Sequence, residues 1–305
     1  MKIAIMGSGG LGGFYGTKLK LAGYKVNFIA RGQHLKAIKE NGLNLIGPEN
    51  NELINNINAT DNPSDIGFVD VVLFCVKLYD VEIASKLISP IVNDNTIIIS
   101  VLNGINGPDR IDKTLQKGKV FGGASRVSAK IEQPGVIKHL GLAEKDVLIF
   151  GNKKFNSSEI ALEFCDACNN SGFNTRITQD IEEMLWDKMS QLCNVAALTT
   201  LGRIPIGKAM QYSELFEIGK SVLQEVEAVA KAKKIKINPN LVKDKIALIK
   251  NFPKNLYASM YHDLVSGKNI EAEDIFGYLS NEGKNLGVST PVTNFIYAFL
   301  KPHIS

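Results

Sequence analysis

The sequence has few of the residues that define disulfide-rich or metal-binding proteins. Its 305 residues include four cysteines and four histidines, whereas a disulfide scaffold needs a much higher cysteine density. Cys165 and Cys168 form one C-x-x-C pair. A zinc site of this type needs a second Cys or His pair at ligand spacing, which the sequence does not provide. We therefore expect a reducing compartment and no bound metal.

Long hydrophobic runs and an excess of one charge are also absent. No segment approaches the ~18 uninterrupted apolar residues of a membrane span, and the first strand leads into a glycine turn instead of a signal-peptide core. The 35 Lys and Arg and 31 Asp and Glu give a net charge of +4, with both signs interspersed. A nucleic-acid binder would carry a basic stripe. We expect a cytoplasmic protein that binds a small anionic ligand, but neither membrane nor nucleic acid.

Length and pattern predict two domains. At roughly 150 residues per domain, this chain corresponds to about two. Its first half alternates between strand-like apolar runs at 2–6, 25–30, 69–76 and 96–101 and helix-like stretches at 12–21, 33–41 and 81–91. Strands that are apolar throughout are typical of a parallel sheet covered on both faces.

The pattern changes near residue 178. Residues 119–178 are β-rich and punctuated by glycine, so we expect further strands in the first domain. Helical spacing then begins with Asp180 and Glu183, which are placed as in a capping box, and more helices are expected at 209–234, 240–249, 255–266, 270–286 and 292–300. The predicted fold class is α/β, with an N-terminal Rossmann-type doubly wound sheet (residues 1–178) and a C-terminal all-α domain (residues 179–305).

A glycine-rich turn follows the first predicted strand. It reads G-x-G-x-x-G and opens a helix, which is the context that a dinucleotide-binding fingerprint requires. Glycines let the main chain turn tightly and approach a pyrophosphate, and the N–H groups at the helix start then hold its charge. The predicted cofactor-binding residues of this turn are Gly7, Ser8, Gly9, Gly10, Leu11 and Gly12.

Polar residues at the ends of later strands extend this prediction. Arg31 ends the second strand, and no Asp or Glu lies between Lys25 and Lys39. An acid at this point selects the ribose hydroxyl of NAD, whereas an arginine accommodates the 2′-phosphate of NADP. We therefore predict that the cofactor is NADPH. We also predict that no carboxylate lies near Arg31 to repel the 2′-phosphate. Lys77 and Asn103 also follow apolar strands. The alternatives are that Arg31 and Lys77 are solvated charges at strand ends and that Asn103-Gly104 is an ordinary turn without any ligand.

Two charged residues interrupt apolar helical faces. Lys188 lies three residues after Leu185 and four before Leu192, on the same face of the expected helix. Desolvation there would lower the pKa of the lysine toward a value useful for proton transfer, which makes Lys188 a candidate general acid. Glu271 shares a face with Ile275 in the same way. The alternatives are a lysine that reaches solvent over apolar neighbours and an acid in a first helical turn.

Taken together, these residues resemble the ketopantoate reductases, or 2-dehydropantoate 2-reductases, and the resemblance extends nearly end to end. The landmarks are the glycine turn, Arg31, Lys77, Asn103-Gly104, Trp186-Asp187-Lys188, Ser259, Glu271 and the closing segment Gly287-Val288-Ser289-Thr290-Pro291.

The resemblance implies an enzyme that reduces 2-dehydropantoate to pantoate with NADPH, in pantothenate and coenzyme A biosynthesis. Lys188 would protonate the keto oxygen, and Asn103, Ser259 and Glu271 would bind the substrate. Arg31, Lys77 and Asn103 would join the glycine turn in binding the cofactor. The substrate would be a small anionic keto acid held in a cleft between the domains. A homodimer is compatible with this plan, although the sequence leaves the oligomeric state open.

The sequence departs from the family pattern at three positions where asparagine is common. Leu192 and Ala196 lie four and eight residues after Lys188, and Phe276 lies near Glu271. Asn194 cannot replace the asparagine expected at position 196. Residues two positions apart on a helix point in directions that differ by roughly 160°, since each residue turns the helix by ~100°. A pocket without these amides favours a more apolar keto acid.

Two other functions stay open from the sequence. Another two-domain dehydrogenase, of 3-hydroxyacyl or glycerol-phosphate type, would fit the glycine turn but match Arg31 and the Trp-Asp-Lys segment less well. A non-catalytic NADPH-binding protein would have kept the cofactor domain while its substrate pocket decayed. Turnover of a panel of keto acids would distinguish these alternatives from the reductase.

Overall fold

The computed structural model describes residues 1–48, 50–141 and 147–304. It contains two compact units, of which the first comprises residues 1–102 and 106–181 and the second residues 103–105 and Glu182 onward. Residues 142–146 fall within the β-rich stretch expected at 119–178 and lie outside the described residues.

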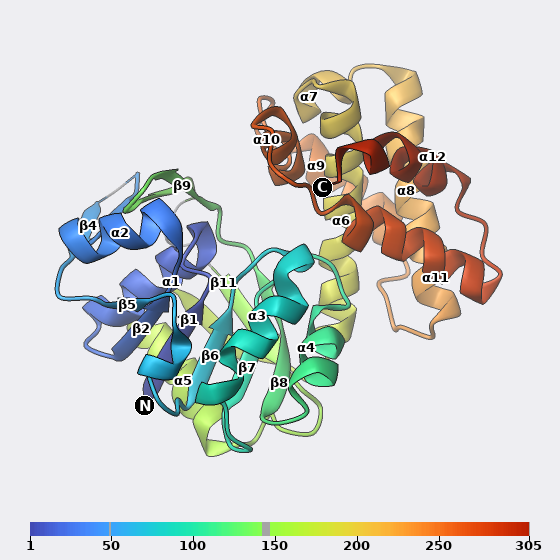
Figure 1. Cartoon of the computed structure of the whole chain (residues 1–305). Coiled ribbons are helices and arrows are strands. Elements are labelled where there is room, and N and C mark those ends of the chain that lie inside the picture. Colours follow the sequence, from blue (N-terminus) through green and yellow to red (C-terminus); the bar gives the residue numbers. More distant parts are fainter. Residues whose placement is uncertain (49, 142–146, 305) are drawn as a thin grey trace. The chain divides into compact units, whose positions relative to one another are not determined.

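A parallel sheet forms the centre of the first unit (Figure 1). Within the described residues it has eight strands, in the order β12 (Asn174–Ile177), β11 (Val147–Gly151), β8 (Lys119–Ser125), β7 (Ile97–Ser100), β6 (Val71–Phe74), β1 (Lys2–Met6), β2 (Lys25–Ile29) and β5 (Asn58–Thr60). All neighbours run parallel except β8 and β11. Strands β6 and β7 are buried along their whole length, because helices cover both faces, and this explains their continuous apolar sequence.

A second, smaller sheet was not expected. Its order is β4 (Asn51–Ile54), β3 (Leu43–Ile46), β10 (Val136–His139) and β9 (Ala129–Gln133). Strands β3 and β10 pair in parallel, and the other pairs are antiparallel. The strands of the β-rich stretch therefore belong to two different sheets. Strands β8, β11 and β12 extend the main sheet, whereas β9 and β10 belong to the smaller one.

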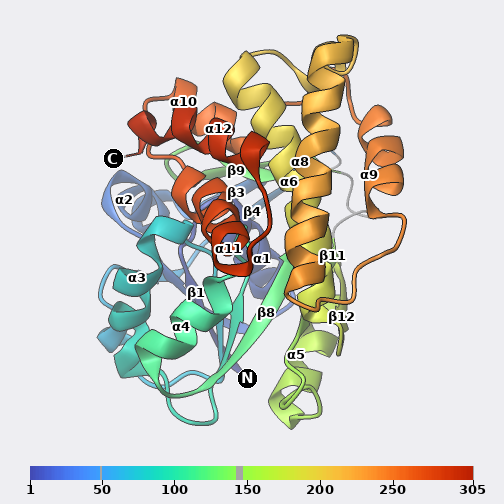
Figure 2. The same ribbon diagram turned by 90° about the vertical axis from the view of Figure 1, so that its right-hand side faces the viewer.

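Helices cover both faces of the main sheet. They are α1 (Gly10–Leu21), α2 (Gly32–Asn41), α3 (Val81–Ile88), α4 (Gly107–Leu115) and α5 (Glu159–Asn170). A buried core joins α1 and α5 to one face, and Figure 2 shows the sheet between α5 on one side and α3 and α4 on the other. The predicted N-terminal Rossmann-type doubly wound sheet is confirmed, although the predicted helices did not include α4 and α5.

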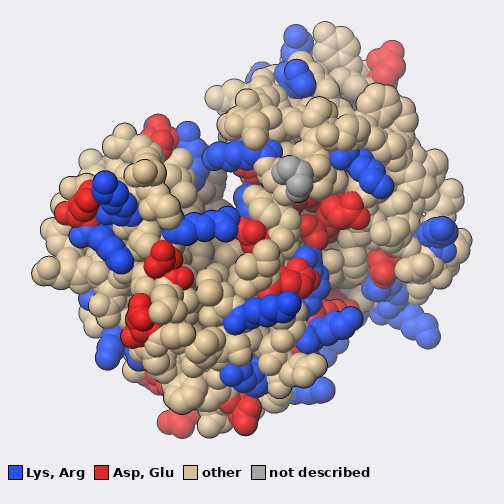
Figure 3. All heavy atoms as spheres, in the orientation of Figure 1, with Lys and Arg blue, Asp and Glu red and all other residues tan. Residues whose placement is uncertain are grey.

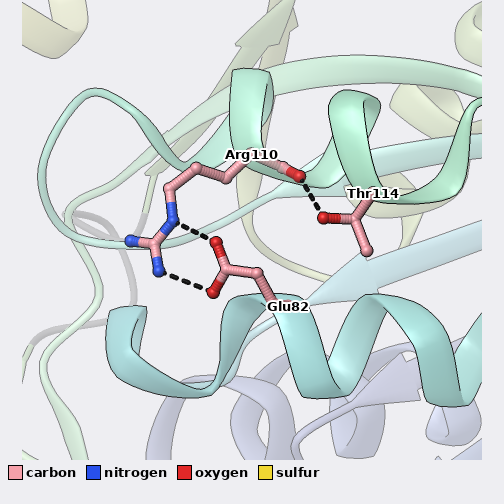
Figure 4. Close-up of polar contacts among 3 residues, drawn as sticks. All are labelled: Glu82, Arg110 and Thr114. Atoms are coloured by element: carbon pink, nitrogen blue, oxygen red, sulfur yellow. Dashed lines mark hydrogen bonds and ion pairs between the residues drawn. The ribbon is translucent and has the colours of Figure 1, made fainter.

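An ion pair joins α3 to α4 (Figure 4). The Arg110 guanidinium donates from Nε and Nη2 to the two carboxylate oxygens of Glu82, at 2.7 and 2.8 Å. These hydrogen bonds hold the pKa of Glu82 below its usual range. Thr114 Oγ1 donates to the Arg110 carbonyl oxygen at 2.8 Å. The pair lies at the surface and contributes about 0–1 kcal/mol, so apolar burial does most to hold these helices on the sheet.

The second unit is all-helical, as predicted. Its elements are α6 (Ile181–Gly202), α7 (Ile206–Ala209), α8 (Ser213–Ala232), α9 (Leu241–Lys250), α10 (Ser259–Val265), the π-helical segment η5 (Glu273–Gly277), α11 (Tyr278–Leu286), α12 (Pro291–Leu300) and the 3₁₀ turn η6 (Lys301–His303). Buried Glu225 of α8 accepts hydrogen bonds from the Val292 and Thr293 N–H groups, both at 2.8 Å. A carboxylate at this position satisfies N–H groups at the start of α12 and complements the helix dipole.

Candidate active site

Close packing around the glycines shapes the predicted cofactor turn. Gly7 has a φ of +90°, which favours glycine. A Cβ on Gly12 would clash with the Gly7 carbonyl oxygen, and one on Gly10 would clash with the Ala129 backbone. A Cβ on Gly9 would instead be 4.0 Å from its nearest neighbour, an Ile131 methyl carbon. The turn is therefore packed on the protein side and has room beside Gly9, where a ligand could approach the backbone.

The start of α1 supplies the electrostatics for an anion. Gly9 is the N-cap residue, no side chain caps the helix, and no acid lies in its first turn. The first N–H groups of a helix have no intrahelical acceptor and lie at its positive end. The Ser8 hydroxyl is not directed to this helix end, because it donates to the Ile29 carbonyl oxygen at 3.1 Å. These features fit the pyrophosphate of a dinucleotide cofactor.

The structure corrects the prediction that no carboxylate lies near Arg31. The exposed Arg31 side chain forms an ion pair with Asp80, with Nη2 3.0 Å from Oδ2. Asp80 belongs to the 3₁₀ turn η2 (Leu78–Asp80), directly after half-buried Lys77. The prediction considered only residues 25–39, whereas the parallel pairing of β1 with both β2 and β6 brings the ends of β2 and β6 to one edge.

In the second unit, Lys188 lies on α6 beside buried Leu185 and Met189. Burial lowers the pKa of Lys188 to about 8, and the nearby Glu271 carboxylate opposes this by raising it. Desolvation disfavours the charged ammonium, and an opposite charge favours it. Lys188 and Glu271, which each interrupt an apolar helical face, thus interact electrostatically.

Asn103 joins this pair. It follows β7 in the chain but belongs to the helical unit, where its Nδ2 donates to Glu271 Oε2 at 3.4 Å. Glu271 is 5% exposed and lies just before the helix that contains η5. Lys188, Glu271 and Asn103 therefore form one polar cluster, which we call the lysine cluster. Exposed Ser259 begins α10, and among the described contacts none links it to this cluster.

The three positions that depart from the family pattern are apolar in the structure as well. Ala196 and Phe276 are buried and Leu192 is half-buried. Asn194 is directed to α8, where its Nδ2 donates to the Gly219 carbonyl oxygen at 2.7 Å. This confirms that Asn194 does not take the place of an amide at residue 196.

Two further polar contacts beside the predicted residues could not be found from sequence spacing. Lys245 of α9 is buried and binds Asp187, the neighbour of Lys188, with Nζ 2.6 Å from Oδ2. His34 of α2 contacts the Ser8 carbonyl oxygen of the glycine turn. Both partners are distant in sequence, and no local pattern pairs them.

Comparisons with known proteins give the family. The model of the family described as ketopantoate reductase PanE/ApbA matches residues 3–153, and that of its C-terminal domain matches residues 180–303. The chain belongs to the ketopantoate reductase family. Like other members it is an NADPH-dependent oxidoreductase.

Individual relatives are similar over nearly their full lengths. A 2-dehydropantoate 2-reductase of Archaeoglobus fulgidus is 27% identical over 95% of this chain and 94% of the relative. A crystal structure of a family member from Ralstonia eutropha superposes with a TM-score of 0.91 at 26% identity, covering 99% of this chain and 98% of that one. A D-mandelate dehydrogenase solved with NADH and anilino(oxo)acetate has a TM-score of 0.89 at 25% identity, with coverage of 99% and 98%.

Other kinds of site find no support in the described residues. No group of three or more His, Cys, Asp or Glu side chains within them could hold a metal ion, and none of their helices is long and apolar enough to cross a membrane. Basic and acidic side chains are interspersed on the face drawn in Figure 3.

Proposed function

We propose that the protein reduces a 2-keto acid to the 2-hydroxy acid with NADPH, and that 2-dehydropantoate is the first candidate substrate. The observation that carries this proposal is the lysine cluster, in which a partly desolvated ammonium interacts electrostatically with a buried carboxylate. Family membership and the packed glycine turn support the same reaction. Its product would then be pantoate, the precursor that pantothenate and coenzyme A synthesis requires.

Lys188 is the proposed proton donor. The keto carbon would receive its hydride from NADPH bound at the glycine turn, which would leave negative charge on the keto oxygen for the protein to stabilise. An ammonium that donates a hydrogen bond to this oxygen stabilises the charge and transfers its proton. With a pKa of about 8, Lys188 is largely protonated near neutral pH and is more acidic than an ordinary lysine, which suits a general acid working at that pH.

Glu271 and Asn103 have supporting roles in the proposal. The Glu271 carboxylate keeps Lys188 charged despite its burial, because it raises the lysine pKa that desolvation lowers. The Asn103 amide binds Glu271, which restricts the carboxylate to one orientation. Arg31, Lys77 and the glycine turn are proposed to bind the cofactor, and Ser259 and Asn103 to contact the substrate.

A second candidate is a reductase for a more apolar keto acid. Leu192, Ala196 and Phe276 offer no hydrogen-bonding group to the hydroxyl of ketopantoate. A site that binds a substrate hydroxyl through polar groups discriminates strongly by them, and an apolar site does not. The name of one similar structure, D-mandelate dehydrogenase, refers to an aryl 2-hydroxy acid, so phenylglyoxylate tests this alternative.

Steady-state oxidation of NADPH decides between the candidates. The full chain should be assayed with 2-dehydropantoate, 2-oxoisovalerate and phenylglyoxylate, beside a Lys188→Ala variant and a control that removes exposed Lys284. A kcat/KM optimum for 2-dehydropantoate would establish the first candidate, and an optimum for phenylglyoxylate the second. NADPH binding without turnover of any keto acid would contradict both and favour a binding protein.

A further inference from the structure

His34 makes hydrogen bonds through both ring nitrogens. Its Nε2 lies 2.8 Å from the Ser8 carbonyl oxygen, and its Nδ1 lies 3.1 Å from the Gly135 backbone nitrogen. A backbone N–H can only donate, so Nδ1 must be the acceptor in the second bond. The hydrogen of a neutral ring is then on Nε2, which donates to the Ser8 oxygen. The two contacts together require one tautomer of the uncharged imidazole.

The Ser8 carbonyl belongs to the peptide unit that also carries the Gly9 N–H. In a planar trans peptide the C=O and the following N–H point in opposite directions. A ring that holds the Ser8 oxygen on one side therefore aims the Gly9 N–H to the other side. Gly9 is also the position of the turn at which a Cβ would have room, so a ligand could approach this part of the main chain.

The second bond joins the turn to a hairpin of the smaller sheet. Gly135, with a φ of +77°, lies between β9 and β10. The same hairpin packs against the start of α1, because a Cβ on Gly10 would clash with the Ala129 backbone of β9 and one on Gly13 would be 2.6 Å from Ile137 of β10. His34 thus connects three segments: α2, the glycine turn and the hairpin beside it.

We propose that His34 is a positioning residue for the cofactor, and that its neutral ring orients the Ser8–Gly9 peptide so that the Gly9 N–H faces the pyrophosphate of NADPH. Burial lowers the pKa of His34 although its hydrogen bond to Ser8 raises it, and the lowered pKa favours the uncharged ring. The proposal depends on NADPH binding at the glycine turn and is independent of which keto acid is reduced.

Binding of NADPH to the full chain tests this role. His34→Phe keeps a ring but removes both hydrogen bonds, and we expect the Kd for NADPH to rise about tenfold or more, because the Ser8–Gly9 peptide is no longer held in the orientation that binds the pyrophosphate. The KM for NADPH should rise by a larger factor than kcat falls, because the proposed role is in cofactor binding. His34→Gln, whose amide can donate to the Ser8 oxygen, should recover part of the affinity. His303→Phe, in η6 near the chain end, is the control and should leave the Kd unchanged.

Two results would overturn the proposal. One is His34→Phe with the wild-type Kd for NADPH. The other is a His34→Gln variant that binds NADPH as weakly as His34→Phe does, when both variants also have a lower kcat and a lower Tm. That result would indicate a general structural role for His34. Nitrogen NMR of the wild-type ring, assigned by comparison with His34→Gln, adds a test without a destabilised variant. It should show a protonated Nε2 and an unprotonated Nδ1 near neutral pH, and the opposite tautomer or a charged ring contradicts the proposal.

Discussion

The two candidate functional regions differ in chemistry. The glycine turn in the first unit is proposed to act through its main chain, because the absence of side chains exposes N–H groups and permits close packing. The lysine cluster in the second unit is proposed to act through side chains, with the Lys188 pKa set by burial and by Glu271. A main-chain site is defined by consecutive residues, whereas a side-chain cluster needs residues brought together by the tertiary fold.

This contrast predicts different consequences of mutation. Substitutions in the turn should change cofactor affinity or folding, because they alter shape. Substitutions in the cluster should change turnover and its dependence on pH, because they alter charge. Variants that mixed these effects would show that the two regions do not act separately.

The largest effect is expected at Lys188. Replacing it with alanine removes the proposed general acid, and kcat should fall about 100- to 10,000-fold, the usual contribution of such a group. The Kd for NADPH should stay unchanged, because the glycine turn is intact. Steady-state kinetics and equilibrium binding measure the two quantities, with Lys284→Ala as the exposed-lysine control. An unchanged kcat would remove Lys188 from the mechanism.

Two glycines of the turn should respond differently to the same change. Gly12→Ala clashes with the Gly7 carbonyl oxygen, and such overpacking costs about 1–3 kcal/mol of stability. A Cβ on Gly9 would lie 4.0 Å from its nearest neighbour, an Ile131 methyl carbon, without a clash. Gly9→Ala should therefore maintain Tm, while its methyl group obstructs the pyrophosphate and raises the Kd for NADPH about tenfold or more. Thermal melts and NADPH titrations of both variants test this. Equal loss of Tm in the two would contradict the assignment of Gly9 to the ligand side.

The pH dependence should reveal the coupling between Lys188 and Glu271. The acid must be protonated, so kcat should fall as pH rises through the lysine pKa of about 8. The Glu271 carboxylate raises that pKa, so Glu271→Gln should move the midpoint of the decline to lower pH. Glu273→Gln is the matched control, because Glu273 accepts a hydrogen bond from Tyr297 instead. A midpoint that does not move in Glu271→Gln would exclude this charge from the tuning of Lys188.

How far the sequence predicts the structure follows from the same contrast. The glycine turn, the fold class and the unusual charge positions could be predicted, because spacing along one strand or helix determines them. The electrostatic interaction of Lys188 with Glu271 and the inclusion of Asn103 in the helical unit could not, because they join residues far apart in the chain. Strand β3 was missed for the same reason, since it pairs with distant β10. Strand β4 was also missed, although it pairs with the neighbouring β3.

The smallest effect is expected at Asp80, where a side chain modifies the otherwise main-chain cofactor site. Asp80 neutralises Arg31 in an exposed pair, and a 2′-phosphate must share the guanidinium with this carboxylate. Exposed charges interact by about 0.2–1 kcal/mol. Asp80→Asn should therefore lower the Kd for NADPH by up to about fivefold at low salt, and the gain should shrink as salt screens the charges.

NADH lacks the 2′-phosphate, so its Kd should not change in Asp80→Asn. Glu82→Gln is the matched control, because Glu82 pairs with Arg110 instead of Arg31 and its loss should leave both Kd values as they are. If Asp80→Asn instead weakened NADPH binding, the carboxylate would be holding Arg31 in place for the phosphate. The cofactor end would then also depend on side-chain pairing across the fold, and the separation between a main-chain region and a side-chain region would fail at Arg31.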